Sequence, residues 1–182
     1  MRVPFLLAAL ALSTTTVLAQ TPPANVAPDA DAPATAVEIG PWRIQVSLID
    51  GVTFDRCMMS RTTEAGIEAR FTRSETGLGL DLSSPRWQLE DGARYEVTFA
   101  ADQRQWEAEV TATATSVSVA LTDDDFIEGL RLANRLEVRG AGATIVVPLD
   151  SSSAALARLE SCYERNSATE VTNPFVAPTR AP

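Results

Sequence analysis

The stretch RYEVTFAADQRQWEAEVTATATSVSVAL, residues 94–121, alternates apolar and polar side chains over most of its length. Successive side chains of a β-strand point to opposite faces of the sheet, so a period of two predicts strands with one buried and one wet face. The same period appears around residues 42–48, 67–71, 78–82 and 136–138, and an apolar run follows at 143–147. About eight to ten short strands separated by turns predict a mainly-β fold, an antiparallel β-sandwich or a partly closed barrel.

Two short helices are expected among these strands. Asp125 is followed three residues later by Glu128, a spacing that resembles a capping box and predicts a helix that begins there. A second helix is expected from Ala154 to about Cys162, capped by Ser153 or a neighbouring serine and carrying leucines at helical spacing.

The Asp50-Gly51 pair indicates a hairpin. A two-residue turn would pair Leu48 with Thr53, whereas a three-residue loop pairs Leu48 with Val52 and keeps one face apolar on both strands. Register follows the buried face, so the longer loop is expected. In that register Cys57 points away from the apolar face, and the terminal helix is expected over an edge or the second face. Residues 90–92 predict the same loop, with Trp87 opposite Tyr95.

Composition excludes several kinds of chemistry. The chain has 182 residues, 24 acidic and 15 basic side chains and a net charge of −9; every basic residue is arginine, and histidine and lysine are absent. Catalysis by a Ser-His or Cys-His pair, a phosphate-binding loop lysine, a Schiff-base lysine and a histidine-ligated metal are therefore excluded. An acidic chain is repelled by phosphate backbones, so no nucleic-acid partner is expected. No cofactor or metal is expected.

The N-terminus has the pattern of a secretory signal peptide. Arg2 precedes an apolar run from Val3 to Leu12, and Val17-Leu18-Ala19 offers a cleavage site, so residues 1–19 are assigned to the signal. Residues 20–40 and 166–182 are rich in Pro and Ala or Thr and predict a linker and a tail around a β-domain at 41–165. Abundant Ala and Arg without lysine are typical of a GC-rich bacterial genome. Together with the signal peptide they predict a bacterial protein that is periplasmic or secreted, with no transmembrane segment after cleavage.

The chain has two cysteines, Cys57 and Cys162. In an oxidising compartment such a pair predicts one disulfide, which here would close a loop of about 100 residues. The alternative of two free thiols lacks the CxxC spacing typical of redox-active pairs.

Three groups of side chains are candidates for a functional site. Asp123–Asp125 lacks the spacing of a calcium loop and is better explained as a helix cap. Glu107 and Glu109 share one face of a strand, with Arg94 as an expected partner, so a glycosidase pair is not favoured. The three tryptophans occupy apolar positions of the pattern and are expected in the core rather than on a sugar-binding surface: Trp42, Trp87 and Trp106.

The order of signals from Trp42 to Cys162 resembles the invasion-associated locus B (IalB-like) family of exported proteobacterial proteins. The resemblance lies in Trp42 at the first strand, CMMSR at 57–61 and PLDSSSAALARLESC at 148–162. It implies a periplasmic or outer-membrane-associated β-sandwich, linked by name to host-cell invasion, with no enzymatic activity and no catalytic residues to transfer. This chain has Val46 where a first-strand cysteine is expected in that family, so the Cys57–Cys162 pairing is inferred from the cysteine count alone.

The leading functional hypothesis is a non-catalytic exported module that binds a protein or a cell-envelope component through sheet edges or loops. One alternative is a secreted inhibitor or an accessory subunit of another envelope protein, which would present a rigid protruding loop. A second is a carboxylate-dependent glycan hydrolase, which would show a pocket with two acids in different environments. Neither a ligand nor an oligomeric state follows from the residues.

Overall fold

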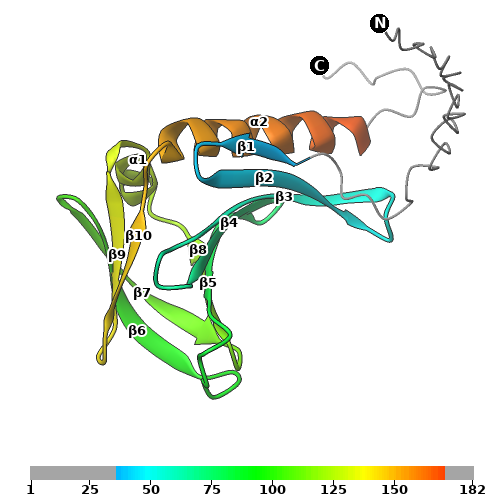
Figure 1. Ribbon diagram of the computed structural model, residues 1–182. Coiled ribbons are helices and arrows are strands. Elements are labelled where there is room, and N and C mark those ends of the chain that lie inside the picture. Colours follow the sequence, from blue (N-terminus) through cyan, green and yellow to red (C-terminus); the bar gives the residue numbers. More distant parts are fainter. Residues whose placement is uncertain (1–35, 171–182) are drawn as a thin grey trace, which may run out of the picture. The chain divides into compact units, whose positions relative to one another are not determined.

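A computed structural model describes residues 36–170. Ten strands, each antiparallel to its neighbours, form one sheet in the order β1-β2-β3-β4-β5-β8-β7-β6-β9-β10 (Figure 1). The predicted antiparallel, mainly-β class with two helices is confirmed, and the sheet is open, because β1 and β10 do not pair with each other. The strands are β1 (Val37–Ile39), β2 (Trp42–Ile49), β3 (Thr53–Thr62), β4 (Glu68–Ser74), β5 (Gly77–Ser83), β6 (Arg94–Ala101), β7 (Arg104–Ala112), β8 (Ser116–Leu121), β9 (Arg135–Arg139) and β10 (Thr144–Pro148), and the helices are α1 (Asp124–Leu132) and α2 (Ser152–Glu170).

One face of the sheet is apolar across the strands. Met59 lies opposite Phe71, Phe71 opposite Leu80, and Leu80 opposite Val119. Because directly opposed residues point to the same face of a sheet, the alternation within each strand becomes a continuous apolar surface. The surface continues through β7, β6, β9 and β10 by the opposed pairs Val110–Tyr95, Phe99–Val138 and Val138–Ile145.

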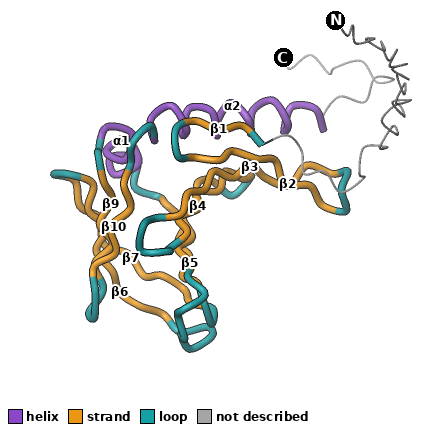
Figure 2. Tube along the Cα trace, in the orientation of Figure 1, coloured by secondary structure: helices purple, strands orange, loops and turns teal. Residues whose placement is uncertain are grey.

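The two helices lie on the same side of the sheet (Figure 2). Helix α2 packs against β3, β2 and β4 and buries Ala155, Leu156 and Leu159 there. Helix α1 packs against β7, β6 and α2, with Phe126 and Leu130 buried. Covering this face removes the largest apolar side chains from water and is the main source of stability for the domain.

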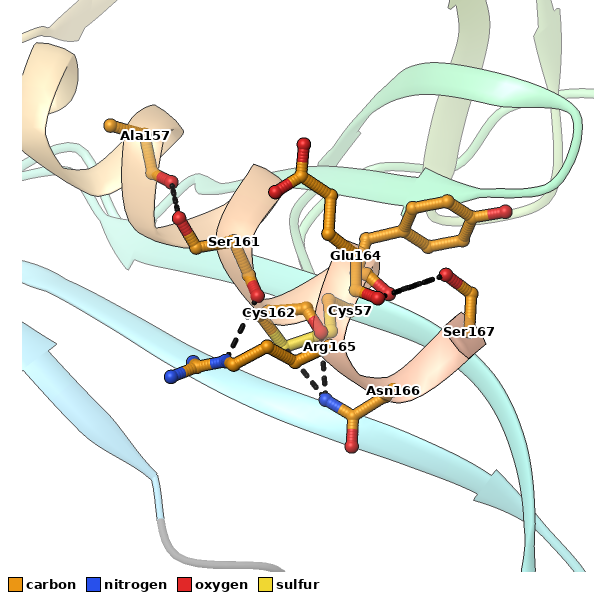
Figure 3. The surroundings of a disulfide bond; sticks show 9 residues. Cys57, Ala157, Ser161, Cys162, Glu164, Arg165, Asn166 and Ser167 are labelled. Carbon is orange, nitrogen blue, oxygen red and sulfur yellow. Dashed lines mark hydrogen bonds between the residues drawn. A yellow bond between two sulfur atoms is a disulfide. The ribbon is translucent and has the colours of Figure 1, made fainter. Parts of the chain in front are cut away.

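A disulfide joins Cys57 in β3 to Cys162 in α2, as expected from the sequence (Figure 3). The Cα atoms are 6.2 Å apart, and the two residues are 105 positions apart in the chain. The side-chain amide of Asn166 donates to the carbonyl oxygen of Cys162 one turn earlier, at 2.7 Å. The bond therefore fastens the C-terminal helix to the centre of the first half of the sheet.

The expected register of the first hairpin is wrong. Leu48 pairs with Phe54, and the register then shifts so that Val46 pairs with Cys57. The extra residue in β3 forms a β-bulge, which interrupts the alternation and turns Cys57 to the same face as Phe54. Helix α2 accordingly covers the apolar face itself: the rings of Phe54 and Tyr163 are 5.8 Å apart.

Other expectations differ from the structure in detail. Residues 84–93 contain no strand, so Trp87 does not pair with Tyr95; instead the amide of Leu89 donates to the carbonyl oxygen of Ala114 at 2.9 Å. The cap of α1 is Asp123, whose carboxylate accepts from the amide of Phe126 at 2.7 Å.

The element boundaries also differ from the expected ones. Strand β1 lies inside the stretch assigned to the linker, where its two apolar positions are too few to form a recognisable period. Helix α2 runs on to Glu170, beyond the expected end of the domain at 165, as a largely polar final segment. The expected signal peptide, most of the linker and most of the tail lie outside the described residues. None of the helices within residues 36–170 is long and apolar enough to cross a membrane.

Arg61 links the first half of the sheet to the segment after β10. Its Nη1 donates to the carbonyl oxygen of Pro148 at 2.7 Å and to the carboxylate of Asp150 at 3.1 Å. The guanidinium lies 5.3 Å from the centre of the Trp42 ring, and the indole Nε1 of Trp42 donates to the Asp150 carbonyl oxygen at 3.0 Å. Side chains thus join the two ends of the open sheet where no strand pairing does.

Replacing both cysteines by alanine is expected to lower the free energy of unfolding by up to about 4–5 kcal/mol, because the bond restricts a long loop of the unfolded chain. Denaturant unfolding followed by tryptophan fluorescence measures this loss. The reduced wild type should unfold at the same denaturant concentration as the double variant. Two titratable thiols in the unreduced, unfolded protein would contradict the pairing.

Arg61→Ala is expected to cost about 2 kcal/mol of stability, since its hydrogen bonds to Pro148 and Asp150 and its cation–π contact are lost. Its Nε is buried without a hydrogen-bond partner among the described residues, which keeps this figure modest. Arg43→Ala is the matched control, because Arg43 is exposed and its ion pair is with the exposed Glu38, and it should change stability by less than about 0.5 kcal/mol. Equal unfolding midpoints for the two variants would show that Arg61 does not link the two ends.

Candidate functional site

Part of the apolar face is left uncovered by the helices and forms a groove of about 610 Å³. Its volume is in the range of small-molecule and peptide side-chain pockets, about 300–1,000 Å³. The lining is almost entirely aliphatic and aromatic: Leu80, Leu82, Trp87, Leu89, Tyr95, Val97, Phe99, Val110, Val117, Val119, Val138 and Ile145, with small residues at 140–143.

The groove exists because the sheet turns between β7 and β8. These strands pair only at Thr111–Ser118 and Ala112–Val117, whereas β6 pairs with β7 along its whole length and β5 with β8 along its whole length. Beyond the two shared pairs the strands separate, so β5 and β8 form one wall and β6, β9 and β10 the other (Figure 1).

Three polar residues are among those that line the groove: the charged Arg94 and Glu96 and the partly exposed Tyr95. The Nη1 of Arg94 donates to the carboxylate of Glu109 at 2.9 Å, so the pairing expected from the sequence is confirmed. A bound group would therefore meet mainly hydrocarbon in the groove, because the charge of Arg94 is paired with Glu109 on the polar face of β7.

The carboxylates that the sequence offers as candidate site residues lie away from this groove or have structural partners. Glu107 and Glu109 are exposed on the polar face of β7, and Asp123 caps α1 with Asp124 and Asp125 in the first turn. Carboxylates in the first turn stabilise the positive end of a helix. Within residues 36–170 no group of three or more His, Cys, Asp or Glu side chains could hold a metal ion.

Two carboxylates outside the groove have shifted pKa values. Burial raises the pKa of Asp81, against the opposing attraction of Arg70 and Arg56. Asp81 shares a polar hollow with Arg56 and Glu109. Hydrogen bonding from Arg139 lowers the pKa of Glu137, and the charges of Arg139 and Arg135 act in the same direction.

The tryptophans differ in environment. Trp42 is fully buried under Arg61, as expected for the core. Trp106 is half-buried and packs on Phe99 and Phe126, with ring centres 5.3 and 5.7 Å apart. Trp87 is half-buried and lines the groove. The core assignment thus holds fully only for Trp42.

A second exposed apolar feature is the tip of the β2–β3 hairpin. Leu48, Ile49 and Val52 are 40%, 52% and 80% exposed around the turn at Asp50-Gly51. Both turn residues have positive φ, 53° and 74°, and the amide of Val52 donates to the carbonyl oxygen of Ile49. The turn therefore has a tight, hydrogen-bonded backbone, while its apolar side chains remain in contact with water.

The fold is similar to that of a known protein. The crystal structure of invasion associated protein B from Bartonella henselae superimposes with a TM-score of 0.55 at 18% sequence identity, covering 72% of this chain and 99% of that chain. The match shows a shared fold. It confirms the fold-level resemblance inferred from Trp42, CMMSR and the C-terminal segment. No protein-family model and no curated protein sequence matches the chain.

The groove has no direct signal in the sequence, because its lining residues show the same alternation as core residues. The expected fold has about eight to ten strands that each supply an apolar face, and only two short helices beside them. The alternation predicts Val97 and Val119 on the apolar faces of their strands, and Ile145 lies in the apolar run at 143–147; the structure leaves all three half-buried around the groove.

Asp81→Asn and Glu137→Gln are expected to change stability in opposite directions at pH 7. An acid with a raised folded pKa costs stability when ionised, so Asp81→Asn should raise the melting temperature at pH 7, and the gain should disappear below about pH 3.8, the ordinary value. Glu137 has a lowered folded pKa, so it contributes stability above its ordinary value of 4.5, and this contribution is lost as the pH falls through the folded value.

Thermal unfolding between pH 3 and pH 7 measures both effects, with Asp91→Asn in an exposed turn as the control. Shifts of the same sign for Asp81→Asn and Glu137→Gln at pH 7 would contradict the assigned environments.

Proposed function

We propose that this protein is a non-catalytic exported module that binds a protein or a cell-envelope component through its apolar groove. The observation that carries the proposal is the groove itself. A contiguous apolar surface that is left open in a folded domain is typical of an interaction site.

The shared fold with invasion associated protein B supports the exported, envelope-related part of the proposal, as does the cysteine pair joined between β3 and α2. The placement of acids supports the non-catalytic part. Glu96 is the one carboxylate among the residues that line the groove, and a pair of carboxylates is the minimum for glycoside hydrolysis.

The hairpin tip favours a second candidate, the accessory subunit or inhibitor. Its three exposed apolar side chains, on a turn of defined geometry, form a compact protruding surface that could enter a pocket of another protein. The tip and the groove lie on different parts of the sheet, so their roles can be separated by experiment.

A photo-crosslinking aromatic residue placed at Tyr95, at Val52 or at Glu107 tests the proposal in cells that export the protein. Tyr95 borders the groove, Val52 is at the hairpin tip, and Glu107 is an exposed control on the polar face. A discrete adduct is expected from position 95, with none from position 107. An adduct from position 52 alone would favour the accessory subunit or inhibitor, and equal adducts from all three positions or none at all would reject both.

A further inference from the structure

We propose that the outer edge of β10 and the adjoining groove together bind an extended peptide segment of a partner protein, which adds to the sheet as a further strand. The inference rests on the proposed function and specifies the partner chemically: a segment with apolar side chains at alternate positions. Its backbone would bond to β10, and those side chains would enter the groove.

The hydrogen-bond pattern shows which groups of β10 face outward. The amide of Gly140 donates to the carbonyl oxygen of Ala143 at 3.0 Å, and β9 and β10 continue from that pair in antiparallel register. Bonded and non-bonded pairs alternate in such a ladder, so Ile145 and Val147 bond to β9. The N–H and C=O groups of Thr144 and Val146 therefore point away from the sheet.

Two contacts agree with this assignment. The amide of Leu149 donates to the carbonyl oxygen of Asn134 at 2.8 Å, which is where the alternation places the next bonded pair. The carbonyl oxygen of Pro148 must then face outward, and it accepts from Arg61 at 2.7 Å. Proline fits this position because its missing N–H would have been on the open side of the strand.

The edge of β10 has only one of the features that usually prevent strand addition, the proline at its C-terminal end, Pro148. Natural edge strands are protected by charged side chains, by proline, by bulges or by being very short. The sequence of β10 is TIVVP, without a charge, and Val146 is 47% exposed. At the opposite edge of the sheet, β1 is three residues long, and its Glu38 pairs with Arg43.

The groove explains which side chains an added strand should carry. Ile145 belongs to β10 and lines the groove, with Leu80 and Leu82 contributed by the opposite wall. A strand added to β10 continues the same pleat, so every second side chain would lie on the groove side beside Ile145. A small apolar ligand could fill the groove, but it would leave the outward backbone groups of Thr144 and Val146 unused; an extended peptide uses both features.

Val146→Pro tests the inference sharply, because it removes an outward N–H that the bonds between β9 and β10 do not use. Val146→Thr is the matched control, since it keeps the backbone donor and the β-branched shape. Thermal unfolding should give similar melting temperatures for both variants and the wild type. The probe is a phage-displayed library of random linear peptides selected on the full-length exported protein.

Selection on the wild type is expected to enrich peptides with apolar residues at alternate positions. A synthetic copy of an enriched peptide should bind Val146→Thr as it binds the wild type and should bind Val146→Pro at least about tenfold more weakly. The same peptide with N-methyl groups along one backbone edge should lose binding. No enrichment, equal binding to Val146→Pro, or enrichment of peptides without the alternation would overturn strand addition.

The two proposals can fail separately. A discrete adduct from position 95 together with a negative peptide selection would leave the interaction module intact and remove strand addition at β10. A concentration-dependent dimer of the wild type that Val146→Pro abolishes, with no peptide enriched, would show that a second copy occupies the edge and would overturn the partner-peptide assignment.

Discussion

The structure depends on covering one apolar face that ten strands share. Alternation makes every strand contribute to that face, and opposed residues such as Phe71 and Leu80 join the contributions into one surface. Two helices are too few to cover it. Helix α2 protects the part formed by β2, β3 and β4, α1 protects the part near Phe99 and Trp106, and the remainder becomes the groove. Core and candidate site are therefore portions of the same surface.

Covalent and polar contacts, in addition to apolar packing, hold helix α2 and the end of β10 in place. The Cys57–Cys162 bond fixes α2 to β3, and on the same helix Glu160 accepts from the guanidinium of Arg73 at 3.0 Å. Arg61 reaches Pro148 and Asp150 and so determines where β10 ends relative to the first half of the sheet. The sheet is open, and these contacts join its two ends while the groove stays uncovered.

Much of the fold could be predicted from local pattern, and the exceptions have physical causes. The alternation of Tyr95, Val97 and Phe99 indicated a half-buried strand because it reflects the pleat directly. The bulge at Asp55 could not be predicted, because Asp55 is polar and follows Phe54 as an ordinary alternating strand residue would. Nothing in the sequence marks it as the extra residue. The prediction of a hairpin at residues 90–92 was wrong. These residues have the Asp-Gly pair of the first hairpin, but the preceding segment bonds elsewhere, through the amide of Leu89 to the carbonyl oxygen of Ala114.

The sequence by itself determined the mainly-β class, the alternation that separates the two faces, the absence of histidine and lysine chemistry, and the only cysteine pair available for a disulfide. These are consequences of residue identity and short-range periodicity. The tertiary structure alone decided which apolar residues remain uncovered, which face Cys57 occupies and which strand lies at the open edge. Burial, register and edge position depend on contacts between residues far apart in the chain, and no local pattern encodes them.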